Sequence, residues 1–220
     1  MMDPIGYGVL TVLADRHRTD KGSLNHHFTD FYEPFLRPIR LDVRRVLEVG
    51  VGNGASLRMW LDYFPSARVF GIDLTFRNVS PPLSTERVML CEADQAKRNE
   101  LTLALKMLGG GQFDLVVEDG GHSMEQQQVT LACLLPHVAV GGYYILEDLH
   151  TSCGEHTFTS TTLALIEHLQ GGPPPSLVHL TKDELDAVRA LASDVWVFGR
   201  GGSITAVIRR SKDIHYMSNF

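Results

Sequence analysis

A glycine-rich turn between an apolar strand and a helical segment constrains this chain more than any other feature. The turn contains Gly50, Gly52 and Gly54 and directly follows the apolar run of residues 45–49. Glycines at these positions allow the backbone to turn tightly and allow a ligand to approach it closely. The order of strand, turn and helix therefore predicts a βα unit whose helix N-terminus faces a binding cleft.

The rest of the chain repeats this alternation. Short runs of β-branched and apolar residues predict strands at 45–49, 69–72, 88–91, 113–117 and 143–146. Helices are predicted between and after them, at 55–62, 96–108, 123–135 and 159–169. Residues 194–198 and 203–208 face each other across a Gly-Arg-Gly-Gly turn and predict a hairpin. We expect an α/β, Rossmann-like fold, with a mostly parallel seven-stranded sheet, an antiparallel C-terminal hairpin and helices on both faces.

Composition favours a globular protein with a small-molecule partner. The chain has 220 residues, 44% hydrophobic and 21% charged, which suits one domain with a continuous core. A net charge of −6 without a long Lys or Arg run argues against a nucleic-acid or lipid-surface partner. No stretch reaches the roughly 18 apolar residues of a membrane helix, so no membrane partner is expected. We expect a single domain, 1–220, with a helical lid segment (1–42) and a Rossmann-like core (43–220).

The cysteines bear on the cellular location. There are three of them, widely spaced and without a Cys-x-x-Cys pair, which argues against a disulfide framework or a zinc knuckle. A reducing, cytoplasmic location fits this pattern best. The assembly state is left open, with a homo-oligomer as one alternative.

An acidic residue about twenty positions after the turn strengthens the prediction of a nucleotide-like cofactor. Asp73 ends the second strand, where acidic residues of nucleotide folds accept hydrogen bonds from ribose hydroxyls. Asp94 and Gln95 follow the third strand, where such folds place a polar residue near adenine. The structural alternatives are that Asp73 only caps a tight turn and that Asp94 caps a helix. We assign to the cofactor Glu48, Gly50, Gly52, Asn53, Gly54, Ser56, Asp73, Asp94, Gln95 and Asp119.

Carboxylates gather where the fourth and fifth predicted strands end. Asp119 follows one strand, and Glu147 and Asp148 follow the other. Neighbouring strands lie about 4.8 Å apart, so these three carboxylates would repel one another unless a cation were bound between them. Oxygen ligands without cysteine favour a hard cation, and we predict Mg²⁺, although another hard divalent ion would also suit them.

A histidine follows the first of these acids by three residues. His122 can reach the same pocket through a short loop, and its neutral imidazole could take a proton from a hydroxyl near neutral pH. The alternative is that the acids cap helices and that the histidine is structural. We predict His122 as the catalytic base.

Two motifs together resemble those of a known family. Asp119-Gly120-Gly121-His122 and Glu147-Asp148 are similar to motifs of the metal-dependent sugar O-methyltransferases of macrolide tailoring, the mycinamicin and macrocin type. The glycine spacing G-x-G-x-G, one residue tighter than the dinucleotide pattern, resembles the first motif of class I methyltransferases. The likeness covers most of residues 20–148 and also includes segments 19–22, 31–33 and 92–95.

The resemblance implies a class I methyltransferase fold with S-adenosylmethionine as cofactor. It also implies Mg²⁺ bound by Asp119, Glu147 and Asp148, and His122 as the base that deprotonates a hydroxyl of a sugar or natural-product intermediate. We expect the chain to be without the long N-terminal domain of the macrolide enzymes, and its sequence after residue 151 matches theirs only loosely. Macrolide specificity is therefore not part of the expectation.

Several alternatives stay open at this point. They are a methyltransferase-fold enzyme with another reaction, such as hydroxylation or rearrangement, a non-catalytic module that senses the cofactor, and an NAD-dependent oxidoreductase. The shorter glycine spacing disfavours the last of these. Four residues of the N-terminal segment are candidates for acceptor or cofactor contacts, with surface or packing roles as the alternative: Lys21, His26, His27 and Tyr32.

Overall fold

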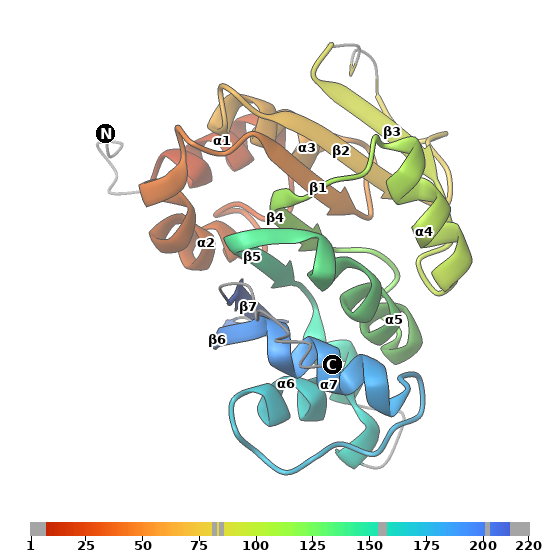
Figure 1. The fold of residues 1–220 in the computed structure, drawn as a ribbon. Coiled ribbons are helices and arrows are strands. Elements are labelled where there is room, and N and C mark those ends of the chain that lie inside the picture. Colours follow the sequence, from red (N-terminus) through yellow and green to blue (C-terminus); the bar gives the residue numbers. More distant parts are fainter. Residues whose placement is uncertain (1–7, 81–82, 84–85, 154–157, 201–202, 212–220) are drawn as a thin grey trace.

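The computed structural model describes residues 8–80, 83, 86–153, 158–200 and 203–211 of the chain. Seven strands of this described part form one sheet in the order β3-β2-β1-β4-β5-β7-β6 (Figure 1). The strands are β1 (Arg45–Val49), β2 (Arg68–Asp73), β3 (Val88–Glu92), β4 (Phe113–Glu118), β5 (Val138–Leu146), β6 (Ala192–Arg200) and β7 (Ser203–Arg210). The first five strands pair in parallel, and β7 pairs antiparallel with both β5 and β6. The predicted mostly parallel sheet with an antiparallel C-terminal hairpin is confirmed.

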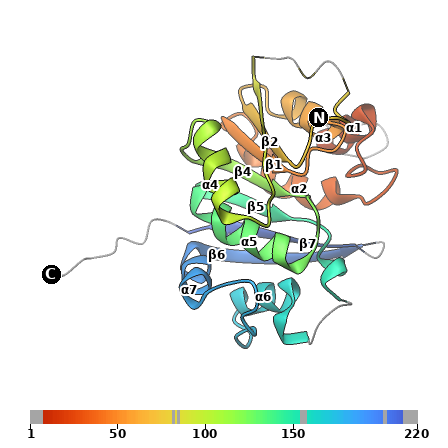
Figure 2. The same cartoon turned by 90° about the vertical axis from the view of Figure 1, so that its right-hand side faces the viewer.

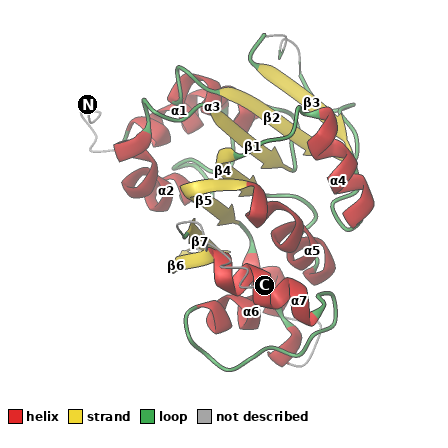
Figure 3. Cartoon of the chain, viewed as in Figure 1, coloured by secondary structure: helices red, strands yellow, loops and turns green. Residues whose placement is uncertain are grey.

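Helices cover both faces of the sheet (Figures 2 and 3). The α-helices of the described residues are α1 (Val9–His17), α2 (Phe28–Leu36), α3 (Ala55–Tyr63), α4 (Arg98–Met107), α5 (Met124–Leu134), α6 (Thr162–Leu169) and α7 (Lys182–Leu191). Short 3-10 helices are η1 (Arg37–Ile39), η2 (Leu135–His137), η3 (Leu149–Cys153) and η4 (Phe158–Ser160). One buried cluster joins the sheet to α1, α2 and α3, and the other joins it to α4, α5, α6 and α7.

The two clusters follow from the alternation of side chains along each strand. In β1, Val46 belongs to the cluster with α1–α3, whereas Leu47 and Val49 belong to the cluster with α4–α7. Parallel strands covered on both faces need apolar residues on both sides, which is why they read as continuous apolar runs. This pattern made the central strands predictable from the sequence.

Two elements differ most from the prediction. β5 begins at Val138, five residues before the predicted start, and contains a register shift next to Gly141, whose φ is 78°. Glycines inside a strand pattern resemble a break, although here they mark an irregularity within the strand. Helix α7 was not predicted, although Thr181 and Glu184 form the capping box at its start, which is a readable signal.

The order of the strands places the site. The sequence order of neighbouring strands reverses at β1, which pairs with β2 on one side and β4 on the other. In open α/β sheets, ligands bind outside the carboxyl ends of the strands at such a switch point. The segment between α1 and α2 reaches this edge, because Lys21 contacts Asp119 and Glu147 there. Among the helices that the structure describes, none combines the length and the apolar character that a membrane span requires.

Candidate active site

A cavity of about 590 Å³ opens at the carboxyl ends of β1, β2 and β4. This volume falls within the usual range for small-molecule sites, roughly 300–1,000 Å³. The predicted site residues that line it are Gly50, Gly52, Asn53, Ser56, Asp73, Gln95, Asp119 and His122. Arg18, Thr19 and Asp20 line it from the N-terminal segment. Three predicted cofactor residues, Glu48, Gly54 and Asp94, are not part of the lining.

The glycine turn has backbone conformations that explain its sequence. Gly50 has a φ of 88°, and a Cβ atom there would lie 1.8 Å from the carbonyl oxygen of Asp119. Gly52 has a φ of 54°, but a Cβ atom there would meet nothing within 4 Å. Gly50 is thus required by close packing against the loop after β4, whereas Gly52 leaves its backbone open to the cavity. An open backbone of this kind suits a cofactor that approaches the turn closely.

Asp73 supports the turn from the end of β2. Its Oδ2 accepts hydrogen bonds from the backbone N–H groups of Val51 at 2.7 Å and Gly52 at 3.1 Å. Its Oδ1 accepts a longer bond from the N–H of Thr75, at 3.3 Å. The carboxylate therefore stabilises the turn while it also lines the cavity.

Glu48, which was assigned to the cofactor, lies behind the turn. It is fully buried, and its Oε2 accepts a hydrogen bond from the Ser56 hydroxyl at 2.8 Å. Burial raises the pKa of Glu48 to about 7, with the charge of Lys21 opposing the shift. Glu48 thus faces the buried groups beneath the site and not the cavity.

The residues after β3 differ in their position relative to the cavity. Asp94 accepts a hydrogen bond from the N–H of Ala96 at 3.0 Å and lies outside the cavity lining. It does not cap α4, whose N-cap residue is Lys97 and which has no side-chain cap hydrogen bond. Gln95 lines the cavity. Its Nε2 donates to Glu118 at 2.6 Å, and its Oε1 accepts from the N–H of Gly121 at 2.9 Å. Gln95 therefore also orders the loop that carries Asp119 and His122.

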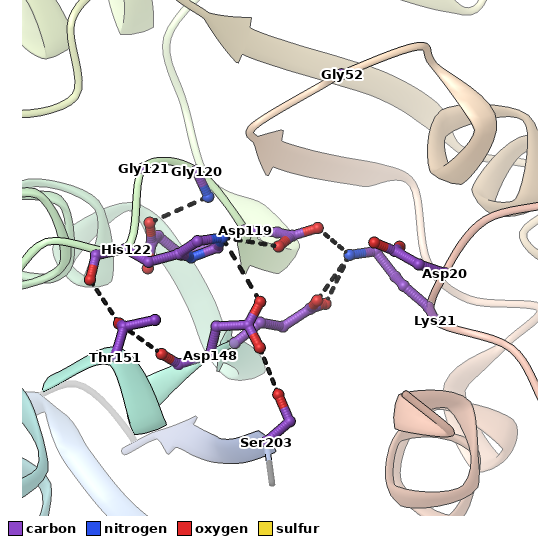
Figure 4. Close-up of polar contacts among 12 residues, drawn as sticks. Asp20, Lys21, Gly52, Asp119, Gly120, Gly121, His122, Asp148, Thr151 and Ser203 are labelled. Carbon is purple, nitrogen blue, oxygen red and sulfur yellow. Dashed lines mark hydrogen bonds and ion pairs between the residues drawn. The ribbon is translucent and has the colours of Figure 1, made fainter. Parts of the chain in front are cut away.

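Two of the predicted metal ligands, Asp119 and Asp148, lie close to the predicted base His122 (Figure 4). Among the described residues, Asp119, His122 and Asp148 each offer one ligand atom, and these atoms lie within 4.8 Å of one another. His122 Nε2 lies 3.8 Å from Asp119 Oδ1 and 3.5 Å from Asp148 Oδ2. Two carboxylates and one imidazole without cysteine fit a hard divalent cation. Glu147, the third predicted ligand, is not in this group.

Two residues of the cluster have a backbone conformation that few side chains adopt. His122 has a φ of 59° and Asp148 a φ of 55°. The hydroxyl of Thr151 lies within hydrogen-bond distance of both carbonyl oxygens, at 2.7 Å from His122 O and 2.8 Å from Asp148 O. Ser203, from β7, donates to Asp148 Oδ1. Left-handed residues outside glycine concentrate at functional sites, where surrounding contacts hold them.

Lys21 is the participant whose role the sequence did not reveal. It is fully buried, and its ammonium donates to Glu147 at 2.9 and 2.7 Å and to Asp119 Oδ2 (Figure 4). Glu48 Oε1 lies 3.7 Å away. Burial alone would lower the pKa of Lys21, but the charges of Asp119, Glu147 and Glu48 outweigh it and raise that pKa well above its ordinary value.

Burial has the opposite effect on the acids. It raises the pKa of Asp119, with Lys21 opposing the shift, and raises the pKa of Glu147 well above its ordinary value, with Asp119 adding to the shift. A positive charge beside these carboxylates therefore favours their ionised forms.

The other lid candidates lie outside the cavity lining. Tyr32 is fully buried, and burial next to Glu147 raises the pKa of its hydroxyl well above the ordinary value. His26 stacks on Phe28 with ring centroids 5.0 Å apart, and His27 Nδ1 lies 3.5 Å from Asp30 Oδ2. The contacts of the two histidines are those of packing and helix-terminal residues, the alternative given for them.

Comparison with known proteins agrees with the fold and the motifs. Residues 47–149 match the family model described as "Methyltransferase domain". The chain is 37% identical over 152 residues to an 8-demethyl-8-(2-methoxy-α-L-rhamnosyl)-tetracenomycin-C 3′-O-methyltransferase of Streptomyces olivaceus, covering 66% of this chain and 38% of that protein. It is 34% identical over 150 residues to the mycinamicin VI 2″-O-methyltransferase of Micromonospora griseorubida, covering 65% and 36%. The match thus spans little more than a third of these relatives.

The structural comparison extends over more of the chain. The solved MycE methyltransferase from the mycinamycin biosynthetic pathway, in complex with Mg and SAH, matches with a TM-score of 0.75 and 27% identity. That match covers 93% of this chain and 54% of the MycE chain. A second MycE structure, which also contains mycinamycin VI, matches with a TM-score of 0.74 and 26% identity. By sequence over residues 47–149 and by its fold, the chain resembles the class I methyltransferases, and among them the macrolide sugar O-methyltransferases.

Proposed function

We propose that the chain is an S-adenosylmethionine-dependent O-methyltransferase that acts, with Mg²⁺, on a sugar hydroxyl of a natural-product intermediate. One observation carries the proposal: the base candidate His122 and the carboxylate Asp119 line the same cavity as the glycine turn. A methyl donor on the turn and a hydroxyl beside Asp119 would therefore share one cavity. The names of the sugar O-methyltransferase relatives support the acceptor class.

The residues of the chain would have the following roles in binding. The open backbone at Gly52 and the lining carboxylate of Asp73 would hold the cofactor. Asp119 and Asp148 would hold the ion, with Glu147 buried next to them. When bound, Mg²⁺ supplies positive charge that makes a nearby hydroxyl more acidic.

The reaction moves one methyl group and one proton. His122 Nε2 would take the hydroxyl proton while the hydroxyl oxygen forms a bond to the methyl carbon and the carbon–sulfur bond of the cofactor breaks. The products are a methyl ether and S-adenosylhomocysteine. Because both reactants are held in one cavity, much of the rate enhancement would come from their positioning.

Methyl transfer to defined glycosides tests this proposal. The protein would be incubated with S-adenosylmethionine, Mg²⁺ and glycosides of the rhamnosyl, olivosyl and macrocin kinds, and products would be followed by mass spectrometry. We expect a methyl ether and equal S-adenosylhomocysteine from at least one glycoside, with loss of product in EDTA. Asp148→Asn should lose the activity, whereas Asp186→Asn, a change at an exposed site on α7, should keep it. Failure of the wild type to bind S-adenosylmethionine in calorimetry would contradict the proposal outright.

A further inference from the structure

Arg18 ends helix α1 in a backbone conformation that usually belongs to glycine. It is the C-terminal cap residue of α1, with a φ of 58° and a ψ of 37°. Its N–H donates to Asp15 O at 3.2 Å, and the N–H of Thr19 donates to Ala14 O at 3.1 Å, which closes the end of the helix. The left-handed conformation costs a residue with a Cβ atom roughly fivefold to thirtyfold in the folding equilibrium constant, so glycine is the common choice at such a cap. An arginine here points to a role beyond ending the helix.

The contacts around Arg18 hold it at the cavity. His17 Nε2 lies 2.8 Å from Asp62 Oδ2 of α3, the helix that begins directly after the glycine turn. The carboxylate of Asp15 accepts hydrogen bonds from the N–H of Ser23 at 2.8 Å and from its hydroxyl at 2.6 Å. These contacts fix the end of α1 against α3 and the following loop against α1. Arg18 lines the cavity from this fixed position.

The cavity lining is acidic apart from Arg18. Asp20, Asp73 and Asp119 line it, and Arg18 is the one Lys or Arg residue among its described lining residues. Asp73 already accepts from the backbone of the glycine turn, and Asp119 accepts from Lys21. Arg18 is exposed, and no hydrogen bond or ion pair joins its guanidinium to the part of the chain that the structure describes. The cavity therefore contains one cation that is available to a ligand.

S-adenosylmethionine offers one anionic group to such a cation. Its sulfonium and ammonium groups are positive, and the carboxylate of its methionine end is negative. A guanidinium stays charged at all relevant pH values and can bind a carboxylate through two parallel N–H···O hydrogen bonds. We propose that Arg18 binds the carboxylate of S-adenosylmethionine and so positions the methionine end of the cofactor beside the glycine turn. The inference rests on the proposed function, and it adds a residue that precedes the segment 19–22 shared with the macrolide enzymes.

Calorimetry with two sulfonium ligands tests this role without any turnover. S-adenosylmethionine and its decarboxylated form, which lacks only the carboxylate, would be titrated separately into the wild type and into Arg18→Gln. We expect the dissociation constant of S-adenosylmethionine to rise by about tenfold or more in the variant, because a charge-assisted pair is lost. The dissociation constant of the decarboxylated form should not rise, since that ligand has no carboxylate. An equal rise for both ligands, or no rise for S-adenosylmethionine, would overturn the inference.

Arg16 provides the matched control. It is an exposed residue of α1, two positions before Arg18, and it is not part of the cavity lining. Arg16→Gln removes the same charge from a neighbouring place, so it measures the effect of long-range charge on cofactor binding. We expect both dissociation constants to change by about twofold or less. A loss of S-adenosylmethionine binding as large as in Arg18→Gln would assign the effect to long-range charge and contradict a direct contact.

Arg18→Gly separates binding from folding. Glycine adopts the left-handed conformation without steric cost but gives the unfolded chain more freedom, so the unfolding equilibrium constant in urea should stay the same or fall by up to about fivefold. S-adenosylmethionine binding should still weaken by about tenfold or more. A rise of the unfolding equilibrium constant by about tenfold or more would show that the arginine holds the turn, and the inference would be wrong.

The same titrations distinguish this inference from the proposed function. If the wild type did not bind S-adenosylmethionine, the proposed function would fail and this inference with it. If the wild type bound S-adenosylmethionine and both Arg18 variants bound it equally well, only the role of Arg18 would be contradicted.

Discussion

At the scale of single residues, left-handed glycines give the turn after β1 its shape. Gly52 on the turn and Gly109 after α4 have φ values of 54° and 85°, and a Cβ atom at either position would meet nothing within 4 Å. Alanine at each should therefore lower the free energy of unfolding by a similar amount, about 1–2 kcal/mol. Only Gly52→Ala should also weaken S-adenosylmethionine binding in calorimetry, because Gly52 lines the cavity. Equal cofactor affinities in the two variants would contradict the assignment of the turn.

Substitution of His122 should affect methyl transfer without affecting cofactor binding. His122→Gln removes the proposed base but no contact of the glycine turn, so methyl transfer should fall by about 100-fold or more while the cofactor dissociation constant changes little. His137→Gln is the control. His137 belongs to η2, before β5, its Nδ1 lies 3.4 Å from Gly111 O, and it is not part of the cavity lining. Single-turnover rates and calorimetry measure the two effects. A His122 variant with near-normal rates would require another base.

At the scale of elements, helix caps connect stability to the site. Ser123 begins α5 directly after His122, and Thr181 begins α7, each in a complete capping box. Ser123→Ala and Thr181→Ala should each lower the free energy of unfolding by about 1 kcal/mol. Only Ser123→Ala should also reduce methyl transfer, because the loop before α5 holds His122 in its left-handed conformation. Thermal unfolding and product formation, measured on both variants, check this difference, and equal activities would contradict it.

The positions of some helices and strands can be predicted from local sequence patterns alone. The capping box of α5 and the apolar runs of the central strands are local signals, so their positions follow from neighbouring residues. β5 was predicted too short because Gly141 and Gly142 resemble a break, whereas the sheet absorbs them as an irregularity between β4 and β5. Pairing with β4, which includes Phe113 opposite Val138, decided where β5 begins.

At the scale of the whole molecule, burial makes stability depend on pH. Glu48 and Glu118 are fully buried, each has one oxygen without a hydrogen-bond partner, and burial raises the pKa of each to about 7. The folded state therefore holds protons that the unfolded chain releases above its ordinary carboxyl pKa. The stability that these protons give is present below that pKa and is lost as the pH rises through about 7.

We expect the free energy of unfolding in EDTA to fall between pH 5 and pH 7, by about 3 kcal/mol for each group at most. Glu118→Gln should flatten this dependence, since glutamine does not titrate and keeps an oxygen that can accept from Gln95. Glu125→Gln, a change at an exposed residue of α5, should leave it unaltered. Urea unfolding across the pH range measures the slopes, and identical slopes in wild type and Glu118→Gln would contradict the prediction.

The sequence by itself determined the class of fold, the glycine turn and the gathering of acids at the strand ends. These follow from local patterns, because strand periodicity, turn glycines and the residue after each strand are read from neighbours in the chain. Only the tertiary structure decided that Asp73 also holds the turn, that Glu48 lies behind it and that Lys21 joins the acids. Lys21 and Glu147 are 126 positions apart. Folding brings them together, and burial then makes their opposite charges necessary to each other.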